Sequence, residues 1–287
     1  LDKYNEKNHS ISPSPEGNRI QNMILSPEKN TTLSLEENRT LLLEKNTTLS
    51  LEENRTLLPE KNTTLSSSKN THITVKKKID PKYIHIPLKK HLKAMGGKKG
   101  NPIYIRIFKS EAVLEIWMKV KDDYVHFEDY PICAYSGDLG PKIKEGDRQS
   151  PEGFYRVYKN NLNPYSRYHL SFNLGYPNPY DRARHRTGSY LMVHGDCRSV
   201  GCYAMTDTQI EDIYGLVKAA LKAGQNYVPV HIFPFRMNDE TMAKYSNHTW
   251  YDFWVKLKEG YDYFEAERRP PYVDIDNGDY VVLEAKE

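Results

Sequence analysis

Residues 194 to 202, HGDCRSVGC, place a histidine, two cysteines, an aspartate and two glycines within nine positions. Histidine and cysteine can hold a metal ion, two cysteines can form a disulfide, and a cysteine beside a histidine can act as a nucleophile with its base. Each of these chemistries requires different partners elsewhere in the chain.

A structural zinc site is disfavoured by the rest of the sequence. Such a site takes four protein ligands, usually from two closely spaced pairs. His194, Cys197 and Cys202 supply three, and the remaining cysteine, Cys133, has no second Cys or His beside it. We therefore expect no metal, and no organic cofactor is indicated either.

Three cysteines are too few for a disulfide scaffold, and an odd number leaves at least one thiol unpaired within the chain. A bond between Cys197 and Cys202 would close a small loop as a resting or regulatory state in an oxidising compartment. Cys133, next to Ile132, is expected to be a small buried apolar side chain.

The third interpretation makes Cys202 a nucleophile. It lies four residues before Thr206, the expected N-cap of a helix whose positive end would favour a thiolate if the loop folds back toward it. His194, at the end of a short apolar segment, can take the thiol proton. Gly201 leaves room for a substrate carbonyl, and the amides of Gly201 and Cys202 can face a developing oxyanion.

The elements that position these residues follow from their periodicity. Alternating apolar residues predict a hairpin with one buried side, and further strands continue it as a β-meander. A capping box of Thr206 and Gln209 starts a helix that Gly224 ends. The expected strands are 103–108, 114–120, 125–133, 150–158, 188–195 and 227–235, with helical segments at 237–245 and 249–267. We expect a mainly β (α+β) fold, a mixed β core with flanking helices.

The segments HG and SVGC resemble the signature of the YkuD-type L,D-transpeptidase family, and CAYSGDLGPKIKEGDRQSPEGFY resembles its upstream turn. From about residue 100 to 275 the chain is most similar to the YafK branch of that family. The resemblance implies a peptidoglycan stem-peptide enzyme in which Cys202 attacks the L-centre carbonyl of meso-diaminopimelate and leaves a thioester. His194 would be the base and then the acid, and the Gly195 carbonyl would orient its ring.

The resemblance also implies several possible outcomes for the thioester. An acceptor amine would give a 3,3 crosslink or attach a lipoprotein, whereas water would give hydrolysis, including the release of wall-anchored lipoprotein associated with the YafK branch. The implied substrate places the protein in the periplasm of a Gram-negative bacterium. A noncatalytic wall-binding module is the alternative of a different class, and a zinc hydrolase is a third.

The chain departs from the family pattern after the nucleophile. Many members follow the cysteine with an apolar residue and then arginine, whereas here Tyr203 is followed by Ala204, and Val200 stands where some members have a second histidine. We therefore expect other residues to contact the substrate. These are Arg182 and Arg186, which can grip carboxylates, with Tyr190 and Ser199; a tyrosine-rich loop at 165–180 is a candidate platform or lid, and His231 a core or near-site histidine.

The first hundred residues differ in composition from the rest. We expect residues 1–75 to be disordered, with 16-residue repeats over 28–66, and residues 76–100 to form a basic, solvated leader before a catalytic domain at 101–287 with a C-terminal helical extension. Nine lysines and one acid between 76 and 99 could attract a polyanion or membrane. The chain's net charge of +3 by itself argues neither for nor against an anionic partner, and we expect no nucleic-acid partner. No apolar run is long enough for a transmembrane segment, and no signal peptide is visible.

Overall fold

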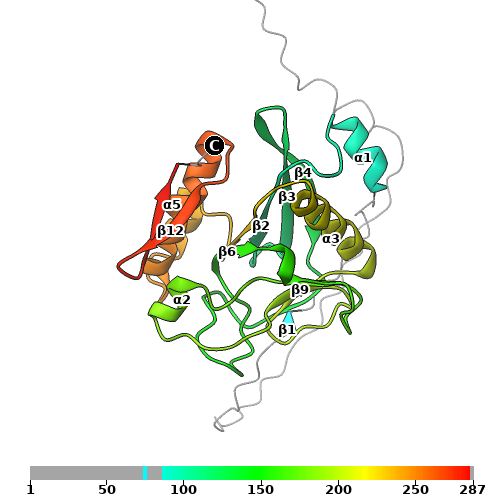
Figure 1. Cartoon of the computed structure of the whole chain (residues 1–287). Helices are drawn as coiled ribbons and strands as arrows, with labels where there is room; N and C mark the ends of the chain where they lie inside the picture. Colours follow the sequence, from blue (N-terminus) through cyan, green and yellow to red (C-terminus); the bar gives the residue numbers. More distant parts are fainter. Residues whose placement is uncertain (1–73, 76–85, 285–287) are drawn as a thin grey trace, which may run out of the picture. The chain divides into compact units, whose positions relative to one another are not determined.

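A five-stranded sheet forms the centre of the protein (Figure 1). The computed structural model describes residues 74–75 and 86–284. The strand order is β4-β3-β2-β11-β6, where β2, β3 and β4 are antiparallel, and β11 is parallel to β2 and antiparallel to β6. The strands are β2 Ile103–Phe108, β3 Val113–Val120, β4 Asp123–Pro131, β6 Gly153–Val157 and β11 Val228–Phe233.

The predicted meander is right for β2, β3 and β4 and wrong for β6. β6 does not continue from β4 but pairs with β11, a strand more than seventy positions further along the chain. β11 therefore joins β6 to β2 and completes the mixed sheet. The mainly β core with flanking helices is confirmed.

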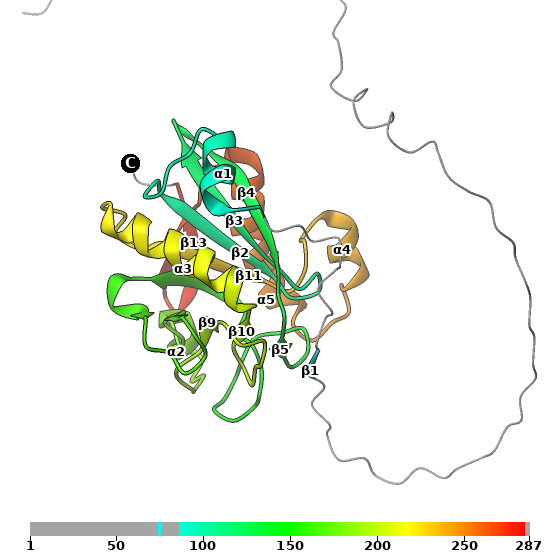
Figure 2. The same cartoon turned by 90° about the vertical axis from the view of Figure 1, so that its right-hand side faces the viewer.

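Both faces of β2 are buried, so the prediction of one buried side was wrong. Ile103, Ile105 and Ile107 belong to the apolar core that includes residues of α3 (Asp207–Lys222). On the other face, the Tyr104 and Phe108 rings contact aromatic rings of α5 (Tyr251–Glu267). Figures 1 and 2 show α3 and α5 on opposite sides of the sheet.

The polar residue Arg106 is tolerated in β2 because its charge is compensated. Its guanidinium makes ion pairs with Glu115 at 2.8 Å and with Glu265 at 2.6 Å. It also lies 4.7 Å from the ring centre of Phe264, which provides a cation–π contact. The alternation of apolar and polar residues in this strand thus reflects two different buried environments.

The predicted helix after residues 194–202 is confirmed. The Thr206 hydroxyl accepts a hydrogen bond from the Gln209 amide, and the Gln209 carboxamide oxygen accepts one from the Thr206 amide. This capping box satisfies amides that the first turn leaves without a helical partner. The helix ends at Lys222, and Gly224 follows with φ +112°.

A smaller sheet of four short strands holds residues 194–202, which run from the end of β9 to the start of β10. Its order is β10-β9-β8-β7, and its β9 and β10 strands are parallel. Two short helical elements lie along the same part of the chain: a turn of 3₁₀ helix before β7 and the helix α2 before β9. The bounds of the strands and of these helical elements are β7 Leu162–Asn163, β8 Ser171–Asn173, β9 Met192–His194, β10 Tyr203–Ala204, η1 Lys159–Asn161 and α2 Pro179–Ala183.

The C-terminal extension is helical only in part. α4 (Asp239–Lys244) and α5 occupy the predicted helical segments, but the chain then forms a β-hairpin of β12 (Tyr272–Asp276) and β13 (Asp279–Leu283). Its two-residue turn is Asn277-Gly278, both with positive φ, a turn that matches the twist of the two strands. The sequence analysis missed this hairpin.

Part of the predicted leader is folded rather than solvated. Residues Leu88–Ala94 form α1, in which Leu92 is buried, while Leu88 and Met95 pack against the apolar core. β1 (Thr74–Val75) pairs with β5 (Tyr135–Ser136), so the predicted disorder of 1–75 does not hold at its last two residues. The repeats at 28–66 lie outside the described residues. No helix in the described part of the chain has the length and apolar character needed to cross a membrane.

A buried ion pair secures the loop between β5 and β6. Lys109 and Glu152 are both fully buried and their Nζ and Oε1 atoms are 3.0 Å apart. The same Nζ donates to the carbonyl oxygens of Asp138, Gly140 and Ser150. The Lys109 ammonium group therefore holds both ends of this loop, from Asp138 to Glu152, by direct contacts.

We predict that Lys109→Met lowers the free energy of unfolding by about 3–5 kcal/mol, because the Glu152 carboxylate would remain buried without its counter-charge. Urea denaturation followed by circular dichroism measures the change. The control is Lys218→Met on the exposed face of α3, which should change stability by less than about 0.5 kcal/mol. Equal stability of the two variants would contradict the structural role of Lys109.

Candidate active site

The parallel pairing of β9 and β10 determines where Cys202 lies relative to the strand that ends in His194. In the ladder Ala204 is opposite His194 and Tyr203 is opposite Val193. One position earlier, the Met192 amide donates to the Cys202 Sγ at 3.4 Å. The register thus sets Cys202, the residue before β10, beside Met192, which lies two positions before His194 in β9.

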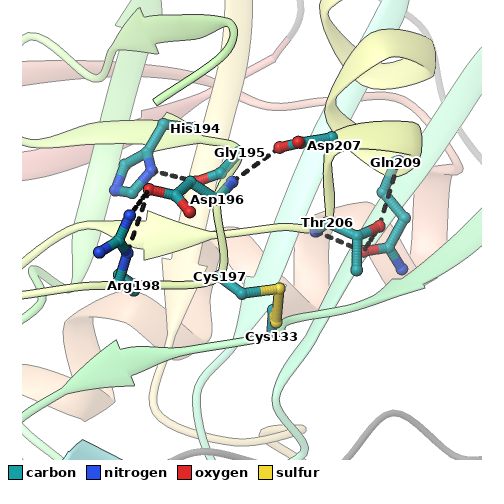
Figure 3. Close-up of a disulfide and its surroundings, with 9 residues drawn as sticks. All are labelled: Cys133, His194, Gly195, Asp196, Cys197, Arg198, Thr206, Asp207 and Gln209. Atoms are coloured by element: carbon teal, nitrogen blue, oxygen red, sulfur yellow. Dashed lines mark hydrogen bonds and ion pairs between the residues drawn. A yellow bond between two sulfur atoms is a disulfide. The ribbon is translucent and has the colours of Figure 1, made fainter. Parts of the chain in front are cut away.

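The loop between these strands is fixed by a disulfide (Figure 3). Cys197 is bonded to Cys133, with the two Cα atoms 5.1 Å apart and 64 positions apart in sequence. This bond rules out the alternative of a disulfide between Cys197 and Cys202, and the prediction that Cys133 is only a small apolar side chain was wrong. The bond also removes Cys197 from any zinc ligand set, and Cys202 remains a free cysteine.

The same loop has an unusual backbone. Asp196, Cys197 and Gly201 all have positive φ, at +67°, +46° and +112°. A conformation of this kind is costly for residues other than glycine and persists where the surroundings impose it. The Asp196 amide donates to the Asp207 Oδ1 at 2.9 Å, and Figure 3 shows this bond tying the loop to the start of α3.

Gly195 is required by close packing. A Cβ atom at this position would lie 2.6 Å from the Asp207 Oδ1 and 3.0 Å from the carbonyl oxygen of Tyr168. The Gly195 amide donates to that carbonyl at 3.1 Å. A side chain here would displace either the start of α3 or the segment that contains Tyr168.

The orientation of the His194 ring follows from one hydrogen bond. Its Nδ1 is 2.6 Å from the carbonyl oxygen of Gly195, and a carbonyl oxygen can only accept, so Nδ1 carries the proton. Nε2 is then the basic nitrogen of the neutral ring. Burial lowers the pKa of His194, and the Gly195 carbonyl and the Asp196 carboxylate partly oppose this shift. The contact with Gly195 expected from the family resemblance is present.

The Cys202 thiol is neutral at rest. Burial raises its pKa above the ordinary 9.0, while the Met192 amide and the charge of Lys142 act in the opposite direction. The predicted thiolate at the helix N-terminus is not supported, because the chain runs from Cys202 through β10 to reach the helix, whose first amides have their own caps.

The peptide groups around Cys202 leave two donors available. Its carbonyl oxygen accepts from the Ser199 Oγ at 2.6 Å and from the Ser150 Oγ at 3.1 Å. Neither the Gly201 amide nor the Cys202 amide donates to a protein acceptor within the described residues. Two unengaged amides beside a nucleophile can bind an oxyanion.

Sequence reasoning missed Ser150 and Lys142. Lys142 is buried, and its Nζ bonds to the Asp147 carboxylate and to the Lys144 carbonyl. The positive charge of Lys142 acts to lower the pKa of the Cys202 thiol. No spacing pattern distinguishes it from the chain's other lysines, although the upstream segment that resembles the family contains both residues.

Of the residues predicted to contact the substrate, some lie near the Cys202 thiol and others do not. The carbonyl of Tyr190, a residue that is 73% exposed, is 3.7 Å from the Cys202 Sγ. Arg186 is buried and paired with Asp181 at 2.9 Å, which argues against its predicted grip on a substrate carboxylate. Arg182 is exposed and lines a separate cavity that contains neither Cys202 nor His194.

Two other predicted features have definite places. The Tyr168 ring, part of the tyrosine-rich loop at 165–180, lies 4.7 Å from the His194 ring, centre to centre. His231 is a core histidine rather than a second base, with its Nδ1 2.8 Å from the Tyr104 hydroxyl. Burial, together with the charges of Arg106 and Arg156, lowers the pKa of His231 to about 3.

The site thus has the parts of a cysteine acyl-transfer centre: a shielded thiol, an oriented neutral histidine and free amides. Residues 102–232 match the YkuD family, described as the L,D-transpeptidase catalytic domain. The protein named "Putative L,D-transpeptidase YafK" of Escherichia coli K12 is 52% identical over 183 residues, which cover 64% of this chain and 74% of that protein. The chain belongs to the YkuD family of L,D-transpeptidase catalytic domains.

Solved structures align more loosely. The helical cell shape determining protein Pgp2 of Campylobacter jejuni gives a TM-score of 0.38 at 17% identity, covering 67% of this chain and 81% of that one. Bd1075 of Bdellovibrio bacteriovorus gives 0.34 at 17% identity, covering 62% and 78%. The family assignment depends on the sequence matches and not on these alignments.

We predict that the double variant Cys133→Ala/Cys197→Ala loses about 4 kcal/mol of stability, because the bond closes a long loop in the unfolded chain. Guanidinium denaturation without reductant measures the loss, and reductant should reproduce it in the native protein. The unfolded, unreduced protein should contain a single reactive thiol, Cys202; three reactive thiols would contradict the disulfide.

We also predict that the rate of Cys202 alkylation by iodoacetamide rises with pH around a midpoint above 9.0, because burial favours the neutral thiol. Mass spectrometry of the intact protein follows the reaction, and Cys202→Ala is the unlabelled control. A plateau of full reactivity at pH 6–7 would instead reveal a thiolate–imidazolium pair.

Proposed function

We propose that this protein acts on peptidoglycan stem peptides through a thioester on Cys202. The observation that carries the proposal is a free Cys202 thiol that accepts from the Met192 amide of β9, the strand that ends in His194, whose ring is oriented by the Gly195 carbonyl. Membership of the L,D-transpeptidase family supports the reaction class and the substrate. The roles of the residues below are inferred from their contacts and chemistry.

In the first step, the Cys202 Sγ attacks the L-centre carbonyl of meso-diaminopimelate as the His194 Nε2 accepts the thiol proton. The carbonyl π electrons move to oxygen, and the amides of Gly201 and Cys202 stabilise the resulting oxyanion. Because both groups begin neutral, charge separates only during attack. The Gly195 carbonyl stabilises the imidazolium through its Nδ1 proton.

In the second step, the tetrahedral intermediate collapses, the carbon–nitrogen bond breaks, and His194 returns its proton to the leaving amine. The remaining thioester is resolved when an acceptor attacks with His194 again as base. An amine acceptor gives a 3,3 crosslink or attaches a lipoprotein, and water gives a trimmed stem or a released lipoprotein. The acceptor that reaches the thioester first decides between transfer and hydrolysis.

The periplasm of a Gram-negative bacterium is the proposed site of action. Its oxidising conditions allow structural disulfides to persist, and the Cys133–Cys197 bond fixes the loop of the proposed nucleophile. The implied substrate is present in the same compartment.

We predict that Cys202→Ala and His194→Ala each lower product formation from purified sacculi by at least about 10³-fold, since each removes a participant in both steps. Mass analysis of released muropeptides measures the products: 3,3-linked dimers indicate transfer, and shortened stems or free lipoprotein indicate hydrolysis. His185→Ala, at an exposed histidine, is the matched control.

Unchanged product yield from Cys202→Ala would overturn the thioester mechanism. If the native protein gives no product but binds sacculi as well as Cys202→Ala does, the protein is a noncatalytic wall-binding module instead.

A further inference from the structure

A second cavity of about 390 Å³ lies between the central sheet and the C-terminal hairpin. Its walls come from β6, η1, α2, β11 and β12, of which β6, α2 and β12 are labelled in Figure 1. None of the residues assigned to the proposed chemistry lines it. Its volume suits a small ligand or one or two units of a polymer, and not a folded partner.

Aromatic side chains form one wall of this cavity. Tyr158 and Tyr227 lie with their ring centres 5.7 Å apart, and Tyr158 is 43% exposed. The Arg156 guanidinium stacks on Tyr227 at 4.9 Å and on Tyr272 at 4.6 Å, and donates to the Val273 carbonyl. The stacking and the hydrogen bond hold the Tyr227 ring in place before a ligand arrives.

Neutral hydrogen-bonding groups complete the lining. Asn160 is exposed at the rim, and Asn178 lies deeper. The His231 ring, only 3% exposed, lines the cavity with Nδ1 bound to Tyr104, and its other nitrogen has no protein partner in the described part of the chain. With its pKa lowered to about 3 by burial, this ring is neutral at physiological pH.

Two neighbouring hollows extend the cavity. One, of about 560 Å³, shares Tyr227, Pro229 and Pro271 with it, and the other, of about 400 Å³, shares Tyr158 and Asn160. Gln225 and Asn226 line both of these hollows. Tyr158 and Tyr227 therefore lie where the cavity meets the two hollows. We call the cavity and the two hollows together the furrow, which is longer than one ligand unit.

We propose that this furrow binds a saccharide chain of β-linked N-acetylated amino sugars. Tyrosine faces pack against the apolar faces of pyranose rings, while amides, a neutral imidazole and guanidinium groups bond to hydroxyl and acetamido groups. Phosphate-rich ligands fit less well, because Arg156 and Arg182 already donate to main-chain carbonyls and Asp274 adds a negative charge to the lining.

This inference deepens the proposed function. It rests on the proposed function at one point only: the natural saccharide would be the glycan to which the stem peptides are attached. A furrow that holds the glycan while Cys202 reaches a peptide would let the enzyme remain on an insoluble polymer between turnovers. Binding to the sugar alone requires neither the thiol nor a stem peptide.

The test is isothermal titration calorimetry of the full chain with the tetramer of β-1,4-linked N-acetylglucosamine, together with amide NMR shifts. We expect saturable binding, shifts at residues around Tyr158 and Tyr227, and at least tenfold weaker binding by Tyr158→Ala. Asn160→Ala, a milder change at the rim, should also weaken binding. The matched control is Val255→Ala, at an apolar side chain of α5 that is 42% exposed and outside the furrow.

Three results would overturn the inference: no saturable binding by the native protein, equal affinity of Tyr158→Ala, or shifts confined to the neighbourhood of Cys202. Tighter binding of a sugar-free stem tripeptide in the furrow would overturn the saccharide assignment as well. Thermal melting confirms that each variant is folded. Because muropeptide release is measured separately, failure of the sugar binding is distinguishable from failure of the proposed reaction.

Discussion

The parallel pairing of β9 with β10 is the constraint on which the site depends. Parallel neighbours are normally joined by a crossover of a dozen or more residues, usually a helix. Here only the eight residues from 195 to 202 return the chain to the start of the next strand. So short a return explains the positive φ angles of Asp196, Cys197 and Gly201 and the close packing of Gly195.

Contacts from outside compensate for this costly backbone. The disulfide to Cys133 holds the middle of the return, Asp207 at the start of α3 holds its first turn, and Ser150 and Ser199 hold the carbonyl of Cys202. Ser150 is in turn fixed through its carbonyl by the buried Lys109. The site is therefore supported by both sheets and by a helix, which keeps thiol and imidazole in register without a direct bond between them.

Burial moves the two pKa values in opposite senses, up for the Cys202 thiol and down for the His194 imidazolium. The pair therefore remains uncharged in the resting protein. Such a thiol is protected from premature reaction with soluble electrophiles. The Lys142 ammonium reduces the cost of the negative charge without abolishing this protection.

The helix beginning after Thr206 was predicted because its signals are local, a capping box and a helical period. A local motif also singled out His194 and Cys202 as candidate site residues. The Cys133–Cys197 bond was not predicted, because pairing across 64 positions depends on the fold. The burial of both faces of β2 was missed because Arg106 reads as a surface residue until its two carboxylate partners are known.

The C-terminal hairpin is a different kind of miss. Asn277-Gly278 between alternating segments is a strong local signal, and it was overlooked behind a long helical pattern. Arg186 was predicted to bind substrate from its charge alone, and only the fold reveals Asp181 beside it. Residue type shows what a side chain can do, whereas its partner decides what it does.

The disulfide also has a consequence for how active protein is made. Three cysteines allow three different single bonds during oxidation, and two of these would consume the sulfur of Cys202. Correct pairing of Cys133 with Cys197 therefore both anchors the loop and leaves the Cys202 thiol free, so errors of oxidative maturation would yield intact polypeptide that lacks this thiol.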